Sequence, residues 1–221
     1  MMTMKMRETV LAGLLCVVTF TYAERPTLIR HFTFDDGFSE SVYRNEPVEI
    51  VGNPGTVEGV SGEAVHLDGQ SALVYDDYFD LNVEQFTFTA WVRLDEQEGL
   101  YAVVNKGVDA YWIFVNHGEV KGGFYDKKFY EAISGTYLQP GKWYFTAITY
   151  DGEMLRLFVD QHLHWIKKIE GKPRSVDGPL VIGAEPNQPH SYFFRGAIDE
   201  VRLYDGAISK AEMLKLYQEH R

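Results

Sequence analysis

Apolar and polar residues alternate one by one in short runs along most of the chain, and turn residues separate the runs. A period of two is typical of strands that bury one face, so the pattern predicts many short antiparallel strands in a sandwich or barrel. The clearest turn signal is Asp151-Gly152, which favours a hairpin between the runs on either side of it. The predicted strands lie within residues 28–34, 64–69, 72–77, 86–94, 100–106, 110–117, 119–126, 142–160, 179–184 and 193–205.

The last part of the chain changes from strand to helix periodicity. Ser209 and Glu212 form the S-x-x-E pattern of a helix capping box. Apolar residues then recur at helical spacing: Met213, Leu214, Leu216 and Tyr217. We therefore predict one short C-terminal helix. Residues 45–62 and 171–178 are rich in Gly, Pro and polar residues, and we predict loops there within a single all-β domain.

The N-terminus has the layout of a secretory signal peptide. Lys5 and Arg7 precede an apolar run over residues 10–20, and small residues follow at Thr21 and Ala23. The run is too short to span a membrane comfortably. We predict cleavage after Ala23.

Cleavage at this place would divide the chain into a signal peptide, residues 1–23, and a domain of residues 24–221. Two alternatives are an uncleaved anchor and lipoprotein processing at Cys16, although Leu15 stands where such signals usually carry a small residue. Cys16 is the only cysteine, so the mature domain would have no disulfide. We expect this domain to be secreted, either extracellular or periplasmic.

Charge narrows the classes of partner. The chain has a formal net charge of -11 and a pI near 5.1. An acidic protein repels phosphate backbones and anionic lipid surfaces, so we expect neither nucleic acid nor a membrane surface as a partner. After signal cleavage we expect no integral membrane segment.

Five blocks of the sequence resemble laminin G-like, concanavalin A-like jelly-roll domains, which occur in many secreted proteins. In order they are HFTFDDG, SGEAVHLDGQSALVY, FTFTAWVRL, GKWYFTAITYDGEMLRLFVD and GAIDEVRLYDGAISKAEM. The resemblance implies a two-sheet antiparallel jelly-roll sandwich with one concave sheet and with the first and last long strands side by side. It also implies a module that binds carbohydrate or protein, in many cases with a calcium ion. Some relatives in the wider superfamily are glucanases, and fold alone does not choose among these functions.

Carboxylates at one end of the predicted sandwich are the candidate metal ligands. Alternation along the last strand places Asp199 on the face of Val201 and Leu203, which predicts an inward carboxylate. Asp35 and Asp36 end the first strand, so the three acids would meet if the terminal strands are neighbours. Carboxylates gathered in a partly buried place need protonation, an arginine or a hard cation.

Calcium fits such a cluster best, because it accepts several oxygens at relaxed geometry. The resemblance points to calcium at this same end, and Asp68, in the turn LDGQ, is a further candidate ligand. In the alternative, Asp199 accepts hydrogen bonds from loop amides or pairs with Arg30 or Arg195. The segment after FDDG departs from the common family pattern, which puts one expected ligand in doubt.

No catalytic constellation is recognisable. Jelly-roll glucanases carry Glu-x-Asp-x-Glu on one strand, whereas Ala197 and Val201 flank Asp199 here. His162 and His164 share one strand face, but two ligands alone do not define a metal site. We therefore predict that the protein is not an enzyme.

The remaining candidates for ligand contact are aromatic residues among polar neighbours. Trp112, Tyr125 and Trp165 are predicted to form a ligand surface, and the alternative is that two or more of them fill the interior. The sequence thus predicts a secreted, non-catalytic binding module for glycans with a structural calcium. An extracellular domain for protein interaction or structure is the second interpretation, and a glycoside hydrolase or polysaccharide lyase is the third.

Overall fold

The computed structural model describes residues 25–76, 81–107, 109–186 and 191–221. The predicted signal peptide, residues 1–23, lies outside the described residues.

Sheet A has eight antiparallel strands. In order across the sheet they are β13 (His162–Lys168), β12 (Met154–Val159), β11 (Trp143–Tyr150), β6 (Phe86–Leu94), β15 (Arg195–Tyr204), β4 (Glu63–Asp68) and β3 (Gly55–Glu58), while β1 (Leu28–Phe32) also pairs with β15. The pairing of β1 with β15 confirms that the first and last long strands lie side by side.

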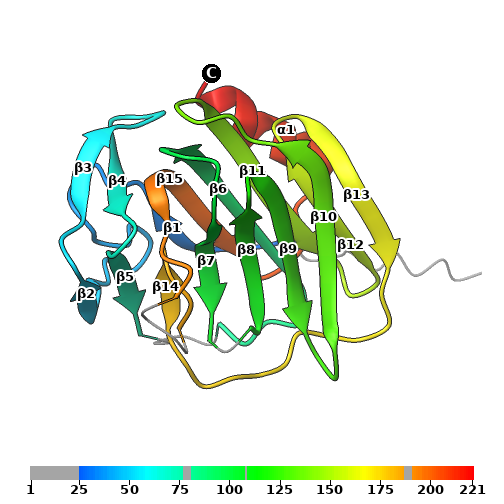
Figure 1. Cartoon of the computed structure of the whole chain (residues 1–221). Coiled ribbons are helices and arrows are strands. Elements are labelled where there is room, and N and C mark those ends of the chain that lie inside the picture. The colour runs from blue at the N-terminus through cyan, green and yellow to red at the C-terminus, as the bar shows by residue number, and fades with distance from the viewer. Residues whose placement is uncertain (1–24, 77–80, 108, 187–190) are drawn as a thin grey trace, which may run out of the picture.

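Sheet B has seven antiparallel strands and lies in front of sheet A in the view of Figure 1. In order they are β10 (Phe129–Tyr137), β9 (Glu119–Tyr125), β8 (Tyr111–Asn116), β7 (Leu100–Lys106), β14 (Leu180–Ile182), β5 (Ala72–Tyr75) and β2 (Glu49–Val51). The two sheets form the predicted all-β sandwich.

The main core fills the space between the two sheets. Strand alternation sends every second residue of β6 into it, among them Phe86 and Phe88, and Ile113 of β8 meets them from sheet B. Burial of a large apolar side chain stabilises a fold by roughly 1.5–3 kcal/mol, so this interior accounts for most of the stability.

The helix α1 (Lys210–Glu219) covers the outer face of sheet A (Figure 1). Ser209 caps it, and the reciprocal hydrogen bonds of Ser209 and Glu212 confirm the predicted capping box. Tyr217 stacks on Trp91 of β6 with ring centroids 5.7 Å apart and an interplanar angle of 10°. The helix therefore closes a second, smaller apolar cluster on the side of sheet A that faces away from sheet B.

Four strands lie outside the predicted ranges, and all four are outermost strands of their sheets. One of them is β13, whose residues entered the prediction only through the strand face shared by His162 and His164. β2 and β3 lie within residues 45–62, which were predicted as a loop, and β10 was not predicted either. Most residues of β2 and β3 are exposed, so neither strand shows a periodic apolar face. Residues 171–178 contain no strand, as predicted.

Candidate functional site

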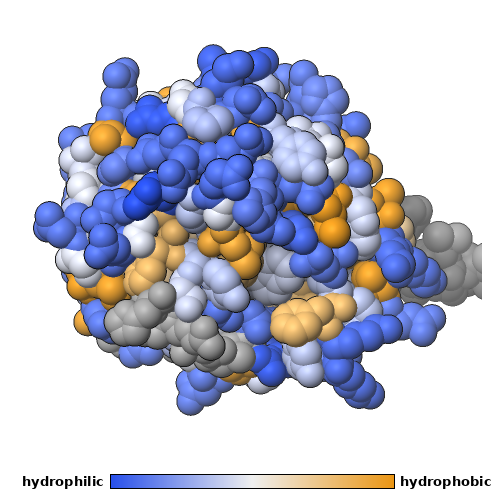
Figure 2. All heavy atoms as spheres, in the orientation of Figure 1, coloured by the Kyte–Doolittle hydropathy of each residue, from blue (hydrophilic) through white to orange (hydrophobic). Residues whose placement is uncertain are grey.

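The outer face of sheet B contains a hollow of about 330 Å³, which we call the sheet-B hollow. In Figure 2 apolar surface gathers in the middle of this face, and hydrophilic residues surround it. The hollow is lined by Leu100, Asp109, Trp112, Phe114, Asn116, Lys121, Phe129, Glu131, Glu185 and Tyr192. Its volume lies within the range of pockets that bind small ligands, roughly 300–1,000 Å³.

Strand register explains why the hollow forms here. Trp112, Phe114 and Asn116 alternate along β8 and face outward, because the residues between them belong to the core. Gly123 of β9 lies opposite Trp112 on one side and opposite Glu131 on the other. A Cβ on Gly123 would lie 2.0 Å from the Tyr130 carbonyl oxygen, so only glycine lets β10 approach β9 this closely beside the hollow.

The aromatic lining consists of a buried floor and an exposed rim. Trp112 is only 5% exposed, and its Nε1 has no hydrogen-bond partner in the described part of the chain. Phe114 packs edge-on against Trp112 and Tyr192, with centroid distances of 5.3 and 6.0 Å. The rings open to solvent are those of Phe129 and Tyr192, 57% and 41% exposed, and neither is among the three predicted ligand aromatics.

Two carboxyl groups lie in the same hollow. Burial raises the pKa of Asp109, although the charge of Arg174 acts against this shift. Burial also raises the pKa of Glu185, and the negative charge of Asp109 adds to that effect. The pair can accept hydrogen bonds from a ligand and, when protonated, donate them.

The rim of the hollow also carries an ion pair. Lys121 Nζ lies 3.5 Å from Glu131 Oε1, which holds these two side chains across neighbouring strands. The hollow therefore presents apolar rings beside both hydrogen-bond donors and hydrogen-bond acceptors.

The three predicted ligand aromatics do not form one surface. Trp112 lies in the floor of the sheet-B hollow. Tyr125 lies beside the hollow, where its ring contacts Phe129 at 4.9 Å and the Arg174 guanidinium at 4.6 Å. Trp165 lines a separate cleft between the edges of the two sheets.

The predicted inward direction of Asp199 is wrong, and a β-bulge is the reason. Asp199 pairs with Trp91 and Arg202 pairs with Thr89, so one extra residue is inserted in β15. Glu200, within this bulge, has a φ of 50°. Because the extra residue reverses the alternation, Asp199 lies on the outer face with Trp91, while Val201 faces the core.

Backbone amides surround the Asp199 carboxylate. Its Oδ2 accepts hydrogen bonds from the N–H groups of Val60 (2.8 Å) and Ser61 (3.3 Å), and its Oδ1 accepts one from Glu200 (2.7 Å). A Cβ on Gly59 would lie 2.4 Å from Oδ2, so the turn can approach only with glycine there. Burial raises the pKa of Asp199 to about 7, although the amide donors act to lower it. These hydrogen bonds agree with the alternative interpretation of the sequence, in which Asp199 accepts hydrogen bonds from loop amides.

Asp35 holds the other side of the same turn, which joins β3 to β4. Its Oδ1 accepts a hydrogen bond from the Glu63 N–H at 2.8 Å. Asp36 is exposed, and Asp68 lies at the opposite end of β4 from Glu63. Asp68 Oδ1 accepts hydrogen bonds from the Gln70 N–H (2.9 Å) and from the Ser71 hydroxyl (2.8 Å). Asp68 therefore stabilises the turn that follows β4.

The four predicted metal ligands are therefore not gathered at one point. Among the described residues, no group of three or more His, Cys, Asp or Glu side chains could hold a metal ion. Calcium needs a shell of oxygens, whereas N–H donors meet the Asp199 carboxylate, so these residues do not fit the ion. Calcium binding stays a prediction.

A buried ionic cluster completes the outer face of sheet A. Glu200 Oε2 lies 2.5 Å from Arg202 Nη2 and 2.7 Å from His31 Nε2. His220, at the end of α1, is 3.6 Å from the same oxygen. Burial would raise the pKa of Glu200, but the hydrogen bond from His31 and the charge of Arg202 lower it. The charged groups on this face are thus paired within the protein.

The pair of histidines on β13 also has protein partners. His164 Nδ1 lies 3.0 Å from the Ser134 carbonyl and 3.2 Å from Thr136 Oγ1. His162 packs edge-on against His164 at 6.3 Å. The pair joins the edges of the two sheets.

The sandwich of two antiparallel sheets, with a ligand-sized hollow on one outer face, defines a jelly-roll module. Residues 67–213 match the family model described as the concanavalin A-like lectin/glucanases superfamily. The match covers more than half of the chain, so the chain belongs to this superfamily, as its sequence blocks indicated. No curated protein matches the chain.

Solved structures with the same fold include domain 4 of a GH43 extracellular arabinanase from Geobacillus stearothermophilus, in complex with arabinotriose. It is 20% identical, with a TM-score of 0.76, and the match covers 88% of this chain and 100% of that one. The binding domain of Paraclostridial Mosquitocidal Protein 1 is 16% identical, with a TM-score of 0.71, and 87% and 52% of the two chains are covered. The botulinum neurotoxin serotype D binding domain is 15% identical, with a TM-score of 0.69 and coverage of 87% and 51%.

This chain thus spans about half the length of the toxin binding domains. At these identities the likeness shows the fold alone. In the described ranges, no helix is both long enough and apolar enough to cross a membrane.

Proposed function

We propose that the protein is a non-catalytic module that binds glycans at the sheet-B hollow. The observation that carries this proposal is the presence, in one hollow, of the exposed rings of Phe129 and Tyr192 with the carboxyl groups of Asp109 and Glu185. Proteins bind sugars with aromatic faces that pack on the apolar faces of the sugar and with polar side chains that pair with hydroxyls. The arabinanase domain solved with arabinotriose supports a saccharide ligand.

The parts of the hollow have distinct tasks in this proposal. Phe129 and Tyr192 pack against sugar rings from the two sides of the opening. Asp109, Glu185 and Asn116 exchange hydrogen bonds with hydroxyl groups. Because the two carboxyls are partly buried, a hydrogen bond to either is stronger than one at an open surface.

An extracellular location is part of the proposal. It is supported by the signal-like N-terminus and by the extracellular arabinanase that contains the relative. Expression in a secreting host and N-terminal sequencing of the exported protein tests it, with Glu24 expected as the first residue.

The binding experiment uses a glycan array together with isothermal titration of arabinotriose. We expect Tyr192→Ala and Phe129→Ala to abolish or strongly weaken binding, because each removes an exposed packing surface. Tyr137→Ala is the matched control, since Tyr137 is 56% exposed on β10 but does not line the hollow. Unchanged binding by both Tyr192→Ala and Phe129→Ala would contradict the proposal. If the wild type binds no glycan on the array, a protein ligand is favoured.

Glycoside hydrolysis is a second candidate, and one observation favours it. A glycosidase also uses two carboxyl groups, one of them an acid with a raised pKa, and Asp109 and Glu185 lie in one hollow. They come from the β7–β8 and β14–β15 connections rather than from one strand. Turnover of a polysaccharide panel that is lost in both Asp109→Asn and Glu185→Gln would establish hydrolysis in place of simple binding.

A further inference from the structure

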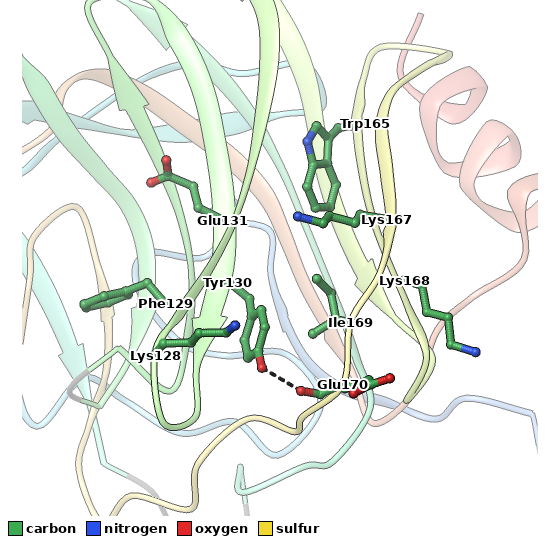
Figure 3. A pocket seen from close by; sticks show the side chains of 9 residues that line it. All are labelled: Lys128, Phe129, Tyr130, Glu131, Trp165, Lys167, Lys168, Ile169 and Glu170. Carbon is green, nitrogen blue, oxygen red and sulfur yellow. Dashed lines mark hydrogen bonds between the residues drawn. The ribbon is translucent and has the colours of Figure 1, made fainter.

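A second concavity lies where the edges of the two sheets meet, between β10 of sheet B and β13 of sheet A. This cleft, of about 720 Å³, is lined by residues of β10, of β13 and of the segments beside them, and we call it the edge cleft. Tyr130 Oη donates a hydrogen bond to the Glu170 carbonyl at 2.6 Å and ties the two sides together near one end (Figure 3). Further along, His164 joins β13 to β10. Contacts between the two sheets therefore bound the cleft at both ends.

The pairing of β13 directs specific side chains into this cleft. Trp165 pairs with Leu157, and Lys167 pairs with Leu155, and both leucines belong to the main core. Trp165 and Lys167 therefore lie on the inner side of β13. At the edge this inner side opens into the cleft, and Figure 3 shows Lys167 directed across it toward β10.

The charges directed into the edge cleft are positive. Figure 3 shows Lys128 beside the ring of Tyr130, and its Nζ lies 5.2 Å from the centroid of that ring. In the described part of the chain, neither Lys128 nor Lys167 has a carboxylate partner within ion-pair distance. Two ammonium groups thus face one cleft in a protein whose formal net charge is -11.

The acidic groups of the lining are engaged elsewhere. Glu131 points toward the sheet-B face and pairs with Lys121. Lys168 points away from the cleft and pairs with Glu153 at 2.5 Å, and the charge of Glu170 also acts on Lys168. An incoming anion would therefore meet Lys128 and Lys167 without displacing a carboxylate.

We propose that the edge cleft is a second saccharide subsite, specific for a sugar that carries an anionic group. The sugar ring packs against Trp165 and Ile169, and its carboxylate or sulfate lies between Lys128 and Lys167. A charge-assisted hydrogen bond is roughly twice as strong as a neutral one, which makes the two lysines the source of specificity. This subsite does not depend on the sheet-B hollow, although Phe129 and Glu131 lie at the border of both.

The test is titration calorimetry of the exported domain, residues 24–221, at low salt with three probes. Tetragalacturonate carries carboxylates, a heparin-derived tetrasaccharide carries sulfates, and the methyl ester of tetragalacturonate has the same sugar chain without charge. We expect at least one charged probe to bind and the methyl ester to bind roughly tenfold or more weakly. The charged probe that binds identifies the source of the anionic group.

Variants then locate the binding in the cleft. We expect Lys128→Gln and Lys167→Gln each to lower affinity roughly tenfold. Lys168→Gln is the matched control, because it changes the net charge equally but points away from the cleft, and it should bind as the wild type does. Trp165→Phe keeps the packing of the core while it reduces the sugar-packing surface, and it should weaken binding of the same probe.

The outcomes separate this proposal from the proposed function. Binding of neither charged probe, equal binding of the methyl ester, or equal losses with Lys168→Gln would overturn the edge-cleft subsite. Tyr192→Ala, which alters only the sheet-B hollow, leaves the cleft intact. A failure of glycan binding at the hollow therefore does not decide the result at the cleft.

Discussion

The outer face of sheet A is covered by other parts of the chain, whereas the outer face of sheet B leaves large rings exposed. On sheet A, α1 packs over Trp91, and the turn between β3 and β4 covers Asp199. On sheet B, Phe129 and Tyr192 are 57% and 41% exposed. Both faces come from strands with the same alternation, so the covering segments decide which face can meet a ligand.

Buried carboxyls on the two faces differ in the same way. The oxygens of Asp199 accept three backbone N–H groups, which fix a turn. Among the described residues, no backbone N–H donates to the side chains of Asp109 or Glu185, and both have raised pKa values from burial. A carboxyl group whose oxygens accept backbone N–H groups stabilises the fold. A partly buried carboxyl group whose oxygens accept no backbone N–H can accept hydrogen bonds from a ligand.

The largest expected effect is a loss of stability on sheet A. Asp199→Ala would leave three backbone donors without their acceptor, and we expect the free energy of unfolding to fall by about 2–4 kcal/mol. Chemical denaturation at about pH 5 measures this. Asp36→Ala, at an exposed position, is the control and should change stability by less than about 0.5 kcal/mol. A loss equal to that of the control would mean that the turn is held by other contacts.

A smaller effect is expected on sheet B, and it concerns binding rather than stability. Glu185→Gln should weaken arabinotriose or the best array ligand by roughly tenfold, since it replaces a charged acceptor by a neutral one. Its unfolding free energy should stay within about 0.5 kcal/mol of the wild type. The comparison between the faces fails if Glu185→Gln destabilises the fold as much as Asp199→Ala does.

The pH dependence of stability sharpens the same comparison. The pKa of Asp199 is about 7 in the folded protein, and its ordinary value in an unfolded chain is 3.8. Between these two pH values the folded state therefore holds a proton that the unfolded state has released. The contribution of this group to stability is therefore full below about pH 4 and declines as the pH rises toward 7. Denaturation at about pH 5 and pH 8 should show a larger gap between wild type and Asp199→Ala at the lower pH. A gap that widens with pH would contradict this sign.

The smallest expected effect concerns calcium. Because amide donors meet the Asp199 carboxylate, we expect the same melting temperature in calcium and in excess chelator. A ligand that binds only the folded state would raise that temperature by mass action. A clear drop on chelation would support the calcium site that the resemblance implies, and a drop that disappears in Asp199→Asn would place the ion there.

Much of the fold could be predicted from local patterns. β6 and the β11–β12 hairpin bury one face in the core, so their alternation is strong, and the Ser209 capping box marks the helix start at Lys210. The ranges of β2, β3, β10 and β13 were not predicted as strands, because outermost strands bury little or pair on one side only, which weakens the alternating pattern.

The candidate site was predicted only in part. Trp112 does line the sheet-B hollow, but Tyr125 and Trp165 lie elsewhere, because strand order decides which aromatics meet. The sequence contained a signal for Phe129 in an aromatic pair with Tyr130, yet its exposure depends on β10 being the last strand of its sheet.

The sequence by itself determined the class of the protein: a two-sheet antiparallel sandwich with a C-terminal helix, recognisable from periodicity and from five blocks in order. Only the tertiary structure decided where each chemical group points. A one-residue bulge in β15 moved Asp199 to the outer face, and the edge cleft formed where β10 packs near β13, a strand far along the chain. Periodicity records whether a residue is buried, whereas its neighbours depend on contacts between segments far apart in the chain.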